Sequence, residues 1–138
     1  QGYALDTLET AVTWDEVDKT LEAVAESLRP ALDDTGTRVH VFTHLSHFYP
    51  DGASIYTTSL FSLAQDPDET LQRWHTLKSA ASQAIVKNKG TISHQHGVGL
   101  DHAHYLAMEK GELGMEVLAD MMRRFDPQGI MNPGKLLA

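Results

Sequence analysis

The sequence has no cysteine among its 138 residues, which excludes disulfide bonds and thiolate metal ligands and weakly favours a cytoplasmic location. It has no apolar run of about 18 residues, so no transmembrane segment is predicted, and no signal peptide is visible. Positive charge is scarce as well. The 11 Lys and Arg against 19 Asp and Glu give a formal net charge of −8, which argues against a nucleic-acid partner.

What remains is an ordinary globular composition, and the length predicts one domain over residues 1–138. Alternating or helical spacing of apolar residues predicts the elements. Strands are expected over residues 3–12, 37–46 and 53–63. Helices are expected over residues 14–29 after a capping box at 13–16, over 67–87, from near residue 102, and through 117–125.

The order of these elements predicts an α+β fold: a ferredoxin-like antiparallel sheet with helices on one face, followed by C-terminal helices. The other face of the sheet is then free to cover a ligand. Because side chains alternate along a strand, His44 and Tyr56 are expected on one face of the hairpin that the second and third strands form.

The most informative stretch is the loop at residues 90–99. His94 and His96 stand two apart, so in an extended segment both imidazoles point to the same side. An imidazole serves as base, acid or metal ligand near neutral pH. Gly97 and Gly99 permit positive φ and let the backbone pass close to a flat or large ligand.

The run Ser-His-Gln-His-Gly-Val-Gly at 93–99, with Asn-Pro-Gly-Lys at 132–135, resembles the C-terminal domain of FAD-linked oxidases of the vanillyl-alcohol oxidase superfamily. That group includes D-lactate dehydrogenases, glycolate oxidase subunits and alkyldihydroxyacetonephosphate synthases. The runs at 44–49 and 52–56 most resemble the synthase-like members. Gln95 stands where the family has a middle histidine, which keeps a hydrogen-bonding side chain and loses a titratable one.

The resemblance implies a cap domain lying over FAD, with the cofactor held mainly by an N-terminal domain that this sequence lacks. Gln1 in place of a methionine agrees with an excised fragment. The implied partners are a small-molecule substrate and the missing FAD-binding domain. Without that domain, the fragment is expected to be inactive, to expose an apolar patch and to form a homodimer.

The resemblance also implies roles for individual residues. The implied catalytic groups are His94, His96 and Tyr56. The implied substrate-binding groups are His44, His47 and Gln95. The implied contacts with FAD are His96, Gly97 and Asn132.

The implied activity is that of an FAD-dependent oxidoreductase or alkyl transferase on a small hydroxy acid or a glycerone-phosphate-type substrate. In the oxidoreductase version His96 or His94 removes a hydroxyl proton. In the transferase version a histidine removes an acidic α-proton from an acylated dihydroxyacetone phosphate.

Two other readings stay open from the residues alone. The pairs at 94/96 and 102/104, with His44 and His47, are enough imidazoles for a divalent metal site, and the chain would then be a metal-binding module. Alternatively, the histidines are ordinary surface groups of a non-catalytic interaction domain.

Overall fold

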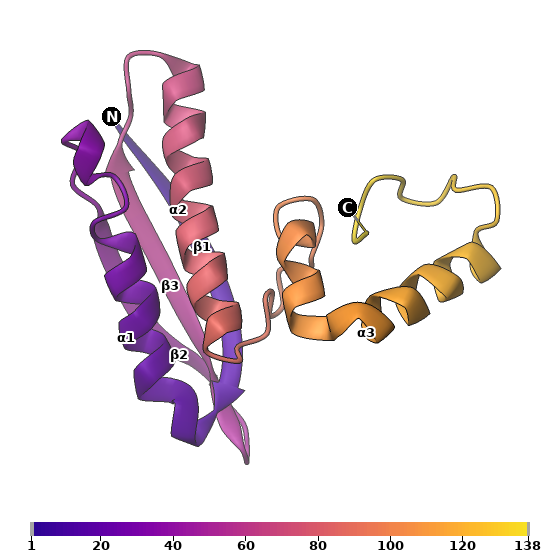
Figure 1. Ribbon diagram of the computed structural model, residues 1–138. Coiled ribbons are helices and arrows are strands. Elements are labelled where there is room, and N and C mark those ends of the chain that lie inside the picture. The colour runs from indigo at the N-terminus through magenta and orange to yellow at the C-terminus, as the bar shows by residue number, and fades with distance from the viewer. Residues whose placement is uncertain (1, 138) are drawn as a thin grey trace.

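The computed structural model describes residues 2–137 (Figure 1). Three strands and three α-helices make up most of it, with two short 3-10 turns. In chain order they are β1 (Tyr3–Thr13), η1 (Trp14–Glu16), α1 (Val17–Leu28), η2 (Asp33–Thr35), β2 (His40–Phe48), β3 (Gly52–Ser62), α2 (Pro67–Lys87) and α3 (Ala103–Phe125).

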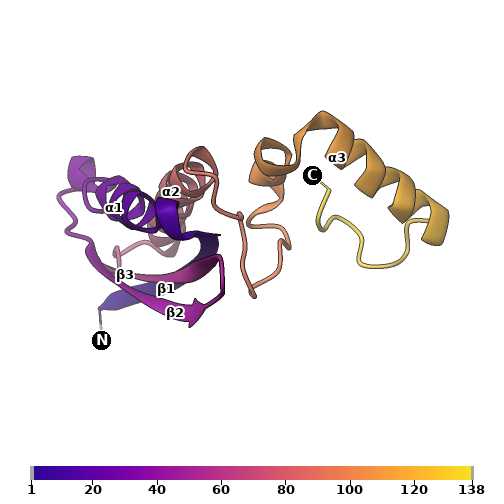
Figure 2. The same ribbon diagram turned by 90° about the horizontal axis from the view of Figure 1, so that it is seen from below.

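The strands form one antiparallel sheet in the order β1-β3-β2. Helices α1 and α2 cover one face, and no helix or strand formed by residues 2–137 covers the other (Figure 2). The core lies between helices and sheet because alternate strand residues point toward the helices. Its buried members are Leu8, Val24, Leu28, Leu32, Val39, Phe61, Leu77, Ala81 and Ile85. The predicted α+β fold, with helices on one face, is confirmed.

A ferredoxin-like sheet has a fourth strand beside β1, and here an irregular segment takes that place. The chain leaves α2 and runs antiparallel to β1, where the Thr91 amide donates to the Ala11 carbonyl at 3.2 Å and the His94 amide to the Glu9 carbonyl at 3.0 Å. The histidine loop is therefore attached to the edge of the sheet by backbone hydrogen bonds.

Strand β2 differs from the expected range of 37–46, since it runs to Phe48. A β-bulge lies between Leu45 and His47, leaving Ser46 without a partner in β3. The turn is correspondingly tighter, with the Tyr49 amide donating to the Gly52 carbonyl at 2.8 Å. An extra residue breaks the period of two, which is why alternation ended the strand too early.

The capping box predicted at residues 13–16 is also wrong. Thr13 makes no capping hydrogen bond, and the chain takes a 3-10 turn before α1 begins at Val17. The Trp14 amide donates to the Asp51 carbonyl at 3.1 Å, and Glu16 pairs with Lys89 at 2.9 Å. The Glu16 carboxylate, which the capping box would have required, thus forms an ion pair with Lys89 instead.

Helix α3 is kinked at Gly111, whose φ of 68° and ψ of 173° are not helical. This break agrees with the two C-terminal helices expected from the sequence. The half after Gly111 projects away from the sheet (Figure 1), and Val117, Met121 and Phe125 are exposed on it.

Candidate active site

A row of three side chains crosses the open face of the sheet. Glu9 of β1 is paired with Tyr56 of β3, and Tyr56 with His44 of β2. The rings of His44 and Tyr56 stack with centroids 5.2 Å apart. The register thus places the two residues that the sequence analysis assigned to one face directly opposite each other.

The bulge in β2 adds more polar groups to this face. His47 is paired with Ser54, which lies two residues before Tyr56 and so points to the same side. Ser46 donates a hydrogen bond to Glu9 Oε1 at 2.5 Å, and its hydroxyl lies 2.6 Å from that of Ser54. In a regular strand His44 and His47 would face opposite sides.

The histidine loop approaches from the edge of β1. Gly90 starts it where a Cβ would lie 2.5 Å from Thr10 Oγ1, so a larger residue does not fit. Helix α3 also holds the loop, because Glu109 accepts a hydrogen bond from the Ile92 amide at 2.7 Å. Burial raises the pKa of Glu109, but hydrogen bonds from Lys110 and the Ile92 amide outweigh it and leave the pKa below its usual value.

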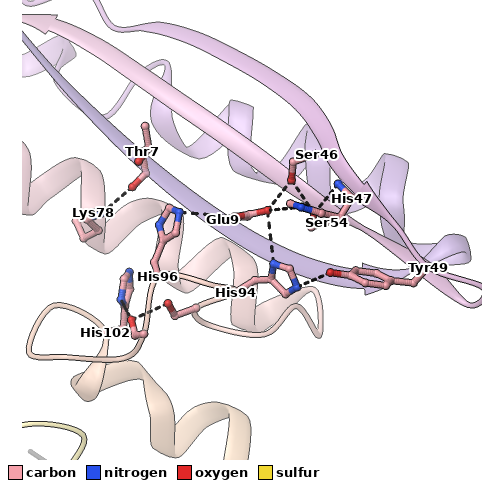
Figure 3. Close-up of polar contacts among 12 residues, drawn as sticks. Thr7, Glu9, Ser46, His47, Tyr49, Ser54, Lys78, His94, His96 and His102 are labelled. Atoms are coloured by element: carbon pink, nitrogen blue, oxygen red, sulfur yellow. Dashed lines mark hydrogen bonds and ion pairs between the residues drawn. The ribbon is translucent and has the colours of Figure 1, made fainter.

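The segment from His94 to His96 is not extended, contrary to expectation, because Gln95 has a φ of 62°. The left-handed residue reverses the chain so that the two imidazoles flank one carboxylate instead of standing in a line. His94 Nδ1 lies 3.5 Å from Glu9 Oε1, and His96 Nε2 lies 3.6 Å from Glu9 Oε2 (Figure 3).

Glu9 is therefore the centre of the site. It is 4% exposed, and His47 Nδ1 lies 3.6 Å from its Oε1. Burial raises the pKa of the Glu9 carboxyl, but hydrogen bonds involving Ser46 and Ser54 and the charge of His94 outweigh burial, so its pKa lies below the usual value. A charged carboxylate is held beneath three imidazoles.

Two aromatic contacts complete the cluster. The Tyr49 hydroxyl lies 3.0 Å from His94 Nε2, a hydrogen bond that reaches from the hairpin to the loop. The rings of Tyr56 and His96 meet edge to face at 5.7 Å. All the histidines and tyrosines expected to act on substrate thus lie on one face of the sheet.

The second His-x-His pair does not join them. His102 is buried, with Nδ1 3.3 Å from the Gly97 carbonyl, and burial followed by the charge of Lys78 lowers its pKa. His104 is exposed in a groove between α2 and α3. Within residues 2–137, no three His, Cys, Asp or Glu side chains form a group that could hold a metal ion, so the metal-module reading gains no support.

The remaining expected residues lie around the loop or beyond it. Gln95 and Gly97 are exposed, and the Gly97 carbonyl accepts a hydrogen bond from Ser93 Oγ at 2.7 Å. Asn132 lies in the tail after α3, next to Met131, whose amide donates to Asp126. Among the described residues it has no hydrogen bond with the histidine cluster. Further along, the Leu136 amide donates to the Gly99 carbonyl at 3.1 Å and brings the tail back to the loop.

Sequence reasoning did not single out Glu9, Ser46 or Ser54. The sequence did hold a signal for Glu9. Because side chains alternate along a strand, Glu9 was expected on the face opposite the apolar Leu8. Nothing in the sequence marked the bulge that turns His47 onto the same face.

The model of the FAD linked oxidases, C-terminal domain, matches residues 1–136. The chain belongs to this family. Its relatives are FAD-linked oxidases, dehydrogenases and alkylglycerone-phosphate synthases, so the domain is part of an enzyme family whose cofactor is FAD.

Individual relatives agree with this membership. The chain is 28% identical over 136 residues to alkyldihydroxyacetonephosphate synthase of Trypanosoma brucei brucei, covering 99% of this chain and 22% of that protein. It is 36% identical over 75 residues to D-2-hydroxyglutarate dehydrogenase of Stutzerimonas stutzeri (strain A1501), covering 54% of this chain and 16% of that protein.

A solved structure of an alkyldihydroxyacetonephosphate synthase matches with a TM-score of 0.60 at 18% identity, over 96% of this chain and 21% of that one, which shows a shared fold. The chain spans about a fifth of the length of the first synthases that it matches. No helix formed by residues 2–137 is long and apolar enough to cross a membrane.

Proposed function

We propose that this chain is the C-terminal substrate domain of an FAD-dependent oxidoreductase or alkyl transferase, working together with an FAD-binding domain. Its substrate is a small hydroxy acid or a glycerone-phosphate-type molecule. One observation carries the proposal: imidazoles from β2 and from the 90–99 loop, with Tyr56, gather around the buried charge of Glu9 on the sheet face that no helix covers.

The residues on this face fit the substrate side of a flavin. A Cβ built on Gly97 or Gly99 meets no atom within 4 Å, so the backbone of the loop is open to a flat ring system. The side chain of His96 is 29% exposed. Away from this face, in the tail after α3, the amide of Asn132 would offer the cofactor both a donor and an acceptor. When bound, FAD would supply the hydride acceptor in the oxidoreductase version of the reaction.

The chain's own residues supply positioning and proton transfer. His96 or His94 accepts the proton of the substrate, and the Glu9 carboxylate, which lies beside both imidazoles, stabilises the imidazolium that results. Tyr56 donates a hydrogen bond to a substrate oxygen, while His44, His47 and Gln95 orient the substrate. The same groups remove a hydroxyl proton in the oxidoreductase version and an acidic α-proton in the transferase version.

The test is single-turnover flavin absorbance in the full-length protein that contains this chain. A panel of D-lactate, D-2-hydroxyglutarate, glycerol phosphate and acyl-dihydroxyacetone phosphate samples both substrate classes. We expect one class to change the flavin spectrum, and His96→Asn to slow that change by about 10²–10⁴-fold, the usual contribution of a general base. His104→Asn, outside the cluster, is the matched control. A wild-type rate in His96→Asn would refute the role of the histidine.

A further inference from the structure

Both ring nitrogens of His94 face groups of the protein itself. Nδ1 is buried and has no hydrogen-bond partner of good geometry among the described residues, its nearest charged neighbour being Glu9 Oε1 at 3.5 Å. Nε2 faces the Tyr49 hydroxyl at 3.0 Å (Figure 3). Neither nitrogen is free to take a proton directly from a bound ligand.

These neighbours also decide where a neutral His94 carries its proton. An unprotonated Nδ1 would direct its lone pair at the negative charge of Glu9 3.5 Å away in a buried contact, so the proton belongs on Nδ1. Nε2 is then an acceptor, and the Tyr49 O–H donates to it. Glu9 thus sets the tautomer, as a carboxylate behind an imidazole does in other relays.

We infer that Tyr49 is a further catalytic residue of this site, that His94 is a positioning residue behind it, and that Tyr49, His94 and Glu9 form one proton relay. This inference rests on the proposed function and refines it. Of the two histidines of the loop, His96 meets the substrate directly and His94 acts only through Tyr49.

The relay removes a proton from the ligand in two heterolytic proton transfers. The ligand's O–H or C–H bond breaks and its proton joins the Tyr49 oxygen, while the Tyr49 proton moves to His94 Nε2. The ligand is left as an anion and His94 as an imidazolium beside the Glu9 carboxylate. No oxidant or reductant takes part in this exchange.

Tyr49 is placed to reach a ligand. It is 38% exposed at the end of β2 and lines an open pocket with Asp51 and Lys89. The Lys89 ammonium is paired with Glu16 at 2.9 Å, so it does not take the Tyr49 hydroxyl away from His94. Two other titratable groups lie beside the relay: the ring centroid of His47 is 6.3 Å from that of His94, and His96 Nε2 is 3.6 Å from Glu9 Oε2.

The tautomer of His94 tests the relay without any enzymatic activity. We expect long-range ¹⁵N–¹H spectra of the 138-residue chain, at mildly alkaline pH, to show the His94 proton on Nδ1. Tyr49→Phe should shift the Nε2 resonance and leave Nδ1 protonated, whereas Tyr3→Phe, at an exposed tyrosine, should change neither. A proton on Nε2 in the wild-type chain would overturn the inference, and that measurement needs no variant.

Kinetics of the flavin-loaded full-length protein supply the second test. Tyr49→Phe should lower kcat by about 10²-fold or more with a smaller effect on KM. Because the members of a relay act as a unit, adding His94→Asn to Tyr49→Phe should cost little more than either change alone. Fully multiplicative losses would overturn the relay. If no substrate of the panel changes the wild-type flavin spectrum, the proposed function fails, and the tautomer measurement still decides the relay.

Discussion

Replacing Glu9 by Gln removes the charge at the centre of the site while keeping the size of the side chain. Ser46 then donates to a neutral amide instead of a carboxylate, which weakens that hydrogen bond by about 1 kcal/mol. The new amide N–H groups also face His94 Nδ1, and a buried donor left without an acceptor costs about 1–3 kcal/mol. We expect a loss of about 2–4 kcal/mol in the free energy of unfolding at neutral pH.

The loss should depend on pH in a defined direction. Folding lowers the pKa of Glu9 below its ordinary value of 4.5, so the charged form favours the folded chain. Its contribution is present in full above about pH 5 and disappears as the pH falls through the lowered pKa. The gap between wild type and Glu9→Gln should therefore narrow in strong acid.

Urea titrations followed by circular dichroism between neutral and acidic pH measure this gap. Glu22→Gln, on the exposed side of α1, is the matched control and should change the free energy of unfolding by less than about 0.5 kcal/mol at every pH. Equal stabilities of wild type and Glu9→Gln at neutral pH would refute the account of Glu9 as a buried, charged centre.

Three other outcomes follow from the structure. Gly90→Ala should lower the free energy of unfolding by about 1–3 kcal/mol in thermal or urea melts, because its Cβ would overlap Thr10 Oγ1. The 138-residue chain should self-associate in light scattering through its uncovered sheet face, and Phe42→Ser, at a side chain 60% exposed, should weaken that association; a monomer at high concentration would contradict this. The same chain should leave the fluorescence of added FAD unquenched, since the nucleotide-binding part is expected in another domain, and tight binding would show that this division is wrong.

Local patterns were enough to predict most of the secondary structure. The alternation in β1 and β3 and the Asp66 cap of α2, whose carboxylate accepts the Asp68 amide at 3.0 Å, are properties of neighbouring residues. The motif at 93–99 pointed to the loop and, by resemblance, to the family. Patterns failed where a distant partner decided the outcome, as at Thr13, where the hairpin holds Trp14 and lysines hold Glu16.

The sequence by itself therefore determined the layer of helices on a sheet and the residue types available for chemistry. Only the tertiary structure decided which of them meet. The bulge at Ser46 turned His47 onto the open face, the edge bonds of residues 91–94 brought two imidazoles to Glu9, and a left-handed Gln95 set them on either side of it. Cross-strand register and backbone reversal bring together residues dozens of positions apart in the sequence. The free energy of those contacts depends on both distant partners, so no local pattern of side chains predicts it.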